Sequence, residues 1–294
     1  MSSLFKGTGV ALVTPFEDSY QVDYNGLAKL LEYHTENGTD YLVVLGTTGE
    51  SPTITREERK EILQFIKSNN PHKLPILYGI GGNDTLGVIH QIKNTDFEGV
   101  DGLLSVSPYY NKPSQAGIIN HYEMIADACP VPVLLYNVPG RTASNLDVST
   151  TLKLAEHSNI IGIKEASGNL HQCIEIASRK PQDFLLISGD DMFTVPLIGL
   201  GGIGVISVMA NAFPALFKKL THGALNGDTN VYTGALRQLS LMNSLMYKES
   251  NPTGIKQVLN EMNICRPVVR PPLLPASPEL TEEIRWVLKQ MHWQ

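Results

Sequence analysis

The sequence is poor in cysteine, in clustered positive charge and in long hydrophobic segments. Its three cysteines, Cys129, Cys173 and Cys265, are far apart and form no CxxC pair, which predicts reduced structural thiols rather than disulfides. No apolar stretch approaches the roughly 18 residues of a membrane-spanning helix, and the first residues do not resemble a signal peptide. We therefore expect a soluble protein of the cytoplasm that has no membrane partner.

Positive charge is too sparse for a surface that binds nucleic acid. The 294 residues include 23 Lys and Arg against 29 Asp and Glu, a formal net charge of −6, and basic residues form no run. This balance argues against nucleic acid and anionic membranes as partners and leaves small molecules open. Because His, Cys, Asp and Glu do not occur at the spacing of metal ligands, we expect no metal site.

The chain does contain a regular alternation of short apolar segments and amphipathic segments. The apolar segments are rich in Val, Ile and Leu without strict alternation, which is typical of strands buried on both faces of a parallel sheet. The amphipathic segments, such as residues 23–38 and 55–70, have the apolar periodicity and the terminal residues of helices. The apolar segments are residues 9–16, 41–50, 74–82, 102–110, 131–140, 160–168, 184–191 and 202–210.

The number and spacing of these units predict an α/β fold, an eight-stranded (β/α)8 TIM barrel. Successive strands begin about 20–33 residues apart, the spacing of βα units, and a doubly wound sheet is the alternative. From about residue 210 only helical patterns follow, with a proline-rich connector at 266–275. We predict a catalytic barrel over residues 1–225 and a C-terminal helical extension over residues 226–294, packed on the barrel or on a neighbouring subunit.

Lys164 stands at the end of an apolar run, where an ammonium group is costly. It follows Ile160, Ile161 and Ile163, and an unpaired buried charge costs several kcal/mol. One explanation is structural, with the amine paired or reaching solvent. The other is chemical, because active sites of barrels lie at the carboxyl ends of strands and desolvation favours a neutral amine. Such an amine attacks carbonyl groups and forms a Schiff base.

Three other groups suited to this chemistry stand at the ends of two other predicted strands. Tyr136 could move protons for a Schiff base, although a core tyrosine is the alternative. Residues 46–51, GTTGES, combine glycines with hydroxyl groups that could bind a carboxylate, but as an isolated turn they are weak evidence. Arg141, in a turn opened by Pro139 and Gly140, could hold a second carboxylate, and a solvated arginine is the alternative.

Seven motifs, taken in order, resemble those of the 4-hydroxy-tetrahydrodipicolinate synthase (dihydrodipicolinate synthase) family. They are GTTGES, SPYYNKP, YNVPGRT, IKEASG, SGDD, GVISV and NPTGIK, and they extend over almost the whole chain. The family belongs to the pyruvate-dependent class I aldolases, which also include N-acetylneuraminate lyase. The resemblance implies a lyase that condenses pyruvate with L-aspartate-4-semialdehyde to 4-hydroxy-tetrahydrodipicolinate, in the diaminopimelate route of lysine biosynthesis.

The resemblance also implies catalytic roles and an assembly. Lys164 would form the Schiff base with pyruvate, and Tyr136 would donate and accept protons. Thr48 would link to this tyrosine, and Tyr110 would complete the proton relay from a neighbouring subunit. The family is usually a homotetramer, a dimer of dimers, and its lysine imine requires neither a metal nor another cofactor.

Substrate-binding residues follow from the same resemblance. Thr47 and Thr48 would hold the carboxylate of pyruvate. Arg141 would bind L-aspartate-4-semialdehyde, since the synthases of the family use the arginine of YNVPGRT for this purpose. Gly189 and Ile206 would line the pocket with backbone groups.

The resemblance further predicts an effector pocket that departs from the pattern of lysine-inhibited relatives. Arg56 and Arg59 stand where those relatives often have histidine or another neutral polar residue, and Gly87 replaces a glutamate that binds the ammonium group of lysine. Two added cations and a lost carboxylate would repel lysine, so we expect weak or absent feedback inhibition. The predicted pocket comprises Ser51, Arg56, Arg59, Asn83, Gly87 and Tyr109.

Two other functions remain open at the level of sequence. An aldolase for N-acetylneuraminate or a 2-keto-3-deoxy sugar acid would keep the barrel, Lys164 and Tyr136, and only the GRT segment and the second-substrate pocket would distinguish it. A non-catalytic barrel that binds small acids is the other alternative, although all the chemical residues are present.

Overall fold

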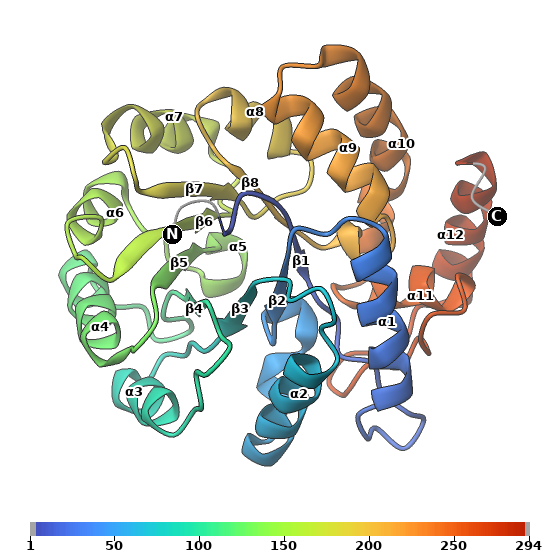
Figure 1. The fold of residues 1–294 in the computed structure, drawn as a ribbon, viewed down its shortest axis with the longest axis horizontal. Helices are drawn as coiled ribbons and strands as arrows, with labels where there is room; N and C mark the ends of the chain where they lie inside the picture. Colours follow the sequence, from blue (N-terminus) through green and yellow to red (C-terminus); the bar gives the residue numbers. More distant parts are fainter. Residues whose placement is uncertain (1–3, 292–294) are drawn as a thin grey trace. The chain divides into compact units, whose positions relative to one another are not determined.

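The computed structural model describes residues 4–291 and contains an eight-stranded parallel barrel (Figure 1). The strands follow one another around the barrel in the order of the chain, from β1 to β8, and the sheet is closed. This confirms the predicted TIM barrel and excludes the doubly wound sheet. The strands are β1 Gly7–Ala11, β2 Tyr41–Val44, β3 Ile76–Gly79, β4 Gly102–Val106, β5 Val133–Asn137, β6 Ile160–Glu165, β7 Leu185–Ser188 and β8 Gly204–Ser207.

Helices alternate with the strands and then continue alone to the end of the described chain. The α-helices are α1 Tyr24–Glu36, α2 Arg56–Ser68, α3 Thr85–Lys93, α4 Gln115–Ala128, α5 Pro139–Thr142, α6 Val148–Leu154, α7 Leu170–Arg179, α8 Thr194–Gly199, α9 Pro214–Leu225, α10 Thr229–Tyr247, α11 Thr253–Glu261 and α12 Pro278–Gln290. The 3-10 helices are η1 Thr47–Gly49, η2 Ser51–Thr53 and η3 Met209–Asn211.

Burial and capping explain why these segments form strands and helices. Every residue of β2, β3, β5 and β7 is buried, as expected for uninterrupted apolar runs that are covered on both faces. In α2, Thr55 and Glu58 satisfy each other's backbone N–H groups in a capping box, and the Asp23 side chain caps α1. The helices predicted within residues 23–38 and 55–70 are thereby confirmed.

Contacts divide the described chain into two compact units. The first comprises the described residues up to Gly7 together with Pro75–Ile206, and the second comprises Thr8–Leu74 together with the chain from Ser207 onward. In the second unit α10 packs against α9, and α12 packs against α10 and α11. The boundary predicted between residues 225 and 226 lies between α9 and α10, and a separate helical extension after it stays a prediction.

Candidate active site

Lys164 and Tyr136 lie next to each other at the carboxyl ends of β6 and β5. The strands pair with Tyr136 opposite Lys164, and the Lys164 Nζ atom lies 4.2 Å from the centroid of the Tyr136 ring. Each residue is 6% exposed. Among the described residues, the ion pairs do not include Lys164. The amine therefore faces an aromatic ring in a buried position, and a carboxylate partner does not explain its place in the barrel.

Gly189, one of the residues predicted to line the pocket, leaves space beside Lys164. A Cβ atom on Gly189 would lie 2.6 Å from the Ala166 Cβ atom and 3.0 Å from the Lys164 Cε atom. The Gly189 N–H donates to the Glu165 carbonyl oxygen at 2.8 Å, which fixes the backbone here. Any other residue would fill this space. Ile206, the second predicted lining residue, is fully buried in β8.

A buried carboxylate holds the ends of β5 and β6 together. Asn137 pairs with Glu165 across the two strands, one position after Tyr136 and Lys164, and its Nδ2 donates to both Glu165 carboxylate oxygens at 3.0 and 3.2 Å. The Gln172 side chain of α7 donates to the same carboxylate at 3.0 Å, as does the Ser167 N–H at 2.6 Å.

Neither Asn137 nor Glu165 is predicted from the sequence to have a role. The signal that could have found them is their position, since each directly follows a predicted catalytic residue at the end of an apolar run. Adjacent residues of a strand point to opposite faces. The hydrogen bonds of this pair therefore keep Tyr136 and Lys164 in register without occupying the space between them.

Arg141 is exposed and lies in a short helix directly after β5. Residues 139–142 form the short helix α5 rather than the simple turn predicted from Pro139 and Gly140, because proline fits the first position of a helix. Thr142 is buried, and its hydroxyl donates to the Ser144 carbonyl oxygen at 2.7 Å. A fixed backbone with an exposed arginine suits a ligand carboxylate.

Tyr110 projects from its own chain into solvent. It is 89% exposed and adopts a left-handed backbone conformation with a φ of 68°, which is strained for an aromatic residue. The preceding residue, Tyr109, is tied by its carbonyl oxygen to the Asn83 side chain at 3.1 Å. The predicted contact of Tyr110 with a neighbouring subunit stays a prediction.

The GTTGES segment forms a tight turn in the second unit. Thr47 and Thr48 lie in η1. Glu50, directly after η1, and Leu45, two residues before it, both have a φ of 55°. The Gly49 carbonyl oxygen accepts a hydrogen bond from the Thr14 hydroxyl at 2.7 Å. The turn thus carries two threonine side chains, of which Thr48 is 2% exposed, and its backbone is tied to Thr14 at Gly49.

The six residues of the predicted effector pocket fall into two groups. In the second unit, the Arg59 guanidinium donates to the Ser51 carbonyl oxygen, and Arg56 is exposed. In the first unit, Asn83 binds the Tyr109 carbonyl, and a Cβ on Gly87 would lie 2.5 Å from the Asp84 carboxylate. A single pocket formed by all six stays a prediction.

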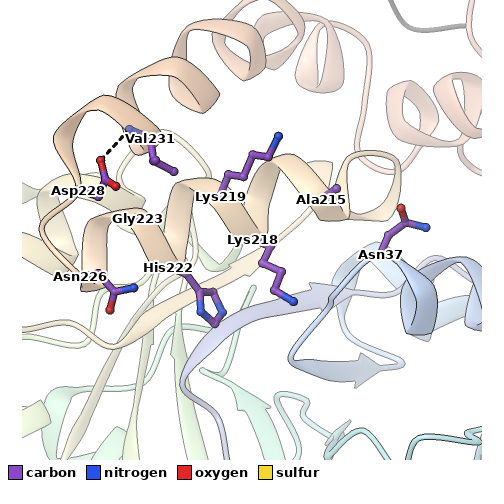
Figure 2. A pocket seen from close by; sticks show the side chains of 9 residues that line it. All are labelled: Asn37, Ala215, Lys218, Lys219, His222, Gly223, Asn226, Asp228 and Val231. Atoms are coloured by element: carbon purple, nitrogen blue, oxygen red, sulfur yellow. Dashed lines mark hydrogen bonds between the residues drawn. The ribbon is translucent and has the colours of Figure 1, made fainter.

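A cavity of about 440 Å³ in the second unit contains none of the predicted site residues (Figure 2). Figure 2 shows Lys218 and His222 on one side of α9 and Lys219 on the other, so the cationic groups do not converge. The His222 Nε2 atom lies 2.8 Å from an Asp40 carboxylate oxygen. The cavity is lined by Asn37, Ala215, Lys218, Lys219, His222, Gly223, Asn226, Asp228 and Val231.

The cysteines have the environment of structural thiols. All three are free and buried, and burial raises the pKa of the Cys173 and Cys265 thiols to about 12. Within residues 4–291, no cluster of three or more His, Cys, Asp and Glu could hold a metal ion. In the same part of the chain, no helix combines the length and the apolar character needed to cross a membrane.

A closed barrel with a buried lysine beside a buried tyrosine at its strand ends is an arrangement suited to a barrel enzyme that uses a lysine nucleophile. The chain belongs to the dihydrodipicolinate synthetase family, whose model matches residues 4–291. This confirms the resemblance drawn from the seven motifs.

The relatives match over nearly their whole length. The 4-hydroxy-tetrahydrodipicolinate synthase of Cytophaga hutchinsonii is 50% identical over 280 residues, which cover 95% of this chain and 94% of that protein. The crystal structure of dihydrodipicolinate synthase from Aquifex aeolicus has a TM-score of 0.94 and 38% identity, with 98% of both chains covered. A structure described as a monomeric dihydrodipicolinate synthase variant has a TM-score of 0.95 and 35% identity, with 100% of this chain and 99% of that chain covered.

Proposed function

We propose that the protein is a 4-hydroxy-tetrahydrodipicolinate synthase, a lyase that condenses pyruvate with L-aspartate-4-semialdehyde in lysine (diaminopimelate) biosynthesis. The observation that carries this proposal is the buried Lys164 amine, 4.2 Å from the Tyr136 ring, in a barrel of the dihydrodipicolinate synthetase family. No described feature favours the sugar-acid aldolase or the non-catalytic barrel.

The first half of the reaction forms an enamine on Lys164. The neutral amine attacks the keto carbon of pyruvate, and the resulting hydroxyl group leaves as water after it receives a proton from Tyr136. Loss of water leaves a protonated imine, which then loses a proton from its methyl group and becomes a neutral enamine. Thr47 and Thr48 bind the pyruvate carboxylate, a role supported by the paired hydroxyl-bearing residues of the rigid η1 turn.

The second half joins the two substrates and releases the enzyme. The enamine methylene attacks the aldehyde carbon of the semialdehyde, whose carboxylate is bound by Arg141. The amine of the semialdehyde then displaces the Lys164 nitrogen as the ring closes, and the lysine is regenerated. Tyr136 returns protons during these steps, with Thr48 and with the Tyr110 hydroxyl of a neighbouring subunit.

The enzyme is proposed to be a homotetramer built from dimers. The exposure of Tyr110, 89% in the single chain, supports such an assembly. Contact with a second copy would bury this ring and would explain the strained backbone that presents it. We place the enzyme in the cytoplasm, where buried reduced cysteines such as those of this chain are usual. No cofactor is required, since the covalent imine supplies the electron sink.

Feedback inhibition by lysine is proposed to be weak or absent. The Arg59 guanidinium donates a hydrogen bond to the Ser51 carbonyl oxygen, which holds this cation beside a residue of the predicted effector pocket. Gly87 offers no carboxylate to an incoming ammonium group. Steady-state rates should therefore stay near the uninhibited value at millimolar lysine. Inhibition at submillimolar lysine would contradict this proposal.

Borohydride trapping in the presence of pyruvate, followed by peptide mapping, tests the proposed function. The reduced adduct should appear on Lys164 and should be absent from the Lys164→Ala variant. Lys256 is an internal control, because it is fully buried and bonded to Glu50 and should not be labelled. An adduct on another lysine, or no adduct at all, would overturn the proposal. Product formation from the semialdehyde, and not from N-acetylneuraminate, separates the synthase from the aldolase.

A further inference from the structure

The segment that leads into α11 contacts the GTTGES turn of the same unit. The Asn251 side-chain amide donates to the Thr48 hydroxyl oxygen at 3.2 Å, and the Lys256 ammonium donates to the Glu50 carboxylate at 2.5 Å. These partners are 203 and 206 residues apart along the chain. The NPTGIK motif, which has no role in the proposed mechanism, thus touches the turn that carries Thr47 and Thr48.

The Lys256–Glu50 contact anchors the backbone of the turn. Both side chains are almost completely inaccessible to solvent. The Lys256 ammonium also donates to the Val268 carbonyl at 2.8 Å and lies 4.1 Å from the centroid of the Phe16 ring. The second Glu50 oxygen accepts the Arg270 N–H at 2.8 Å. A buried pair with this many satisfied partners holds its two chain segments in one arrangement.

The Asn251 contact acts on the orientation of one hydroxyl group. Asn251 is 8% exposed, and its amide nitrogen donates to the Thr48 oxygen. The Thr48 hydroxyl hydrogen is therefore not used in this contact and can be donated to another acceptor. The Asn251 amide oxygen is buried and has no hydrogen-bond partner among the described residues. A buried amide left half satisfied is costly, so its placement beside Thr48 calls for a reason other than stability.

We propose that Asn251 is a positioning residue, which fixes the Thr48 hydroxyl as a hydrogen-bond donor to the pyruvate carboxylate while the Lys256–Glu50 pair holds the turn. This inference rests on the proposed function, which gives Thr48 its ligand. A carboxylate is a strong acceptor for a hydroxyl whose oxygen is already engaged by the Asn251 amide and whose hydrogen is not. The C-terminal helices thereby take part in pyruvate binding without touching the substrate.

Asn251→Ala and Thr253→Val form a matched pair of test variants. Thr253 lies in the first turn of α11, and its hydroxyl donates a partly buried hydrogen bond to the Leu274 carbonyl oxygen. Thr253→Val removes this bond, which does not involve the GTTGES turn. We expect Asn251→Ala to raise the KM for pyruvate about tenfold with a smaller change in the KM for the semialdehyde. Thr253→Val should change neither KM by more than about twofold. Equal effects of the two variants on the KM for pyruvate would overturn the inference.

A double-mutant cycle with Thr48→Val distinguishes positioning from a general structural role. Because Asn251 acts through the Thr48 hydroxyl, Asn251→Ala should have no further effect on the KM for pyruvate in the Thr48→Val background. Additive effects would contradict the inference. If Asn251→Ala does not fold, Asn251→Ser takes its place in the cycle with the same expected outcome.

Trapping with borohydride distinguishes failure of the proposed function from failure of the positioning role. A wild-type protein that forms no pyruvate adduct refutes the proposed function. A wild-type protein that forms the adduct on Lys164, together with a folded Asn251 variant whose KM for pyruvate is unchanged, refutes the positioning role alone.

Discussion

Lys256 carries a positive charge into the interior of the second unit, where Glu50 neutralises it. Burial lowers the pKa of Lys256, and the adjacent Glu50 carboxylate opposes this shift. Removing one member of a buried pair leaves the other charge without compensation, which is far more costly than the pair itself is stabilising.

We therefore expect Lys256→Met to lower the free energy of unfolding by about 3–5 kcal/mol. Urea denaturation followed by circular dichroism measures this change. Lys153→Met is the matched control, since Lys153 pairs with Glu156 while the two side chains are 55% and 66% exposed, and its unfolding curve should not move. The double variant Lys256→Met with Glu50→Gln should recover part of the loss. Equal curves for the two single variants would contradict the prediction.

Glu58 contributes to stability in a way that depends on pH. Its hydrogen bond with the Arg270 guanidinium is the main reason that its pKa is lowered from 4.5 to about 2. A carboxylate whose pKa falls on folding stabilises the folded protein above the unfolded pKa, and this contribution disappears as the pH falls through the folded pKa.

Stability should thus decline as the pH falls from about 4.5 to about 2, and Glu58→Gln should make this decline shallower. Urea midpoints measured across this interval provide the comparison. Glu156→Gln removes a carboxylate from an exposed pair and should keep the wild-type slope. A Glu58→Gln slope as steep as that of the wild type would show that Arg270 does not act through this carboxylate.

At the scale of elements, the register of β5 and β6 depends on Glu165. Its carboxylate accepts hydrogen bonds from Asn137, Ser167 and Gln172. A glutamine has one acceptor oxygen and would direct its NH₂ group at donors. We expect Glu165→Gln to lower kcat about tenfold or more and the free energy of unfolding by about 1–3 kcal/mol.

Thr151→Val is a control for the loss of a buried polar group in the same unit, since Thr151 is fully buried in α6. It should leave kcat close to the wild-type value. Steady-state kinetics and urea denaturation on both variants decide the point, and a Glu165→Gln enzyme of normal kcat would show that the strand ends keep their register without this carboxylate.

The strand ends that carry Lys164 and Tyr136 are predictable from sequence because both residues close uninterrupted apolar runs. Such runs specify strands locally, and parallel strands in a barrel bring their carboxyl ends to one side. The contact of Asn251 with Thr48 is not predictable in this way. Its partners are separated by 203 residues, and the sequence near a buried amide does not indicate which distant hydroxyl it will meet. The hydrogen bonds of Glu165 are equally hard to predict from sequence, although its partners are closer along the chain. Its three donors come from β5, from the loop after β6 and from α7.

At the scale of the whole molecule, the proposed role of Tyr110 in a neighbouring subunit predicts complementation between two inactive variants. Lys164→Ala lacks the proposed nucleophile, and Tyr110→Phe lacks the hydroxyl of the proposed proton relay. In a mixed dimer, the site with an intact Lys164 would receive Tyr110 from its partner. Mixing, denaturing and refolding equal amounts should restore about a quarter of the wild-type activity, because half of the dimers are mixed and each has one complete site.

Refolding each variant alone is the control and should restore little activity. Activity of the refolded mixture that equals the average of the two separate samples would place Tyr110 in the site of its own chain. Analytical ultracentrifugation of the mixture establishes that assembly has occurred before this comparison is made.

The hydrogen bond from Asn251 to the turn at Thr48 also bears on protein synthesis. Every residue assigned to catalysis or substrate binding, from Thr47 to Ile206, leaves the ribosome before Asn251 is made. A nascent chain of that length holds all the reactive groups but neither the amide that orients Thr48 nor the lysine that neutralises Glu50. The proposed pyruvate site therefore depends on the last 44 of the 294 residues. A message truncated before Asn251 would yield chains with the residues proposed for catalysis but without a finished pyruvate site.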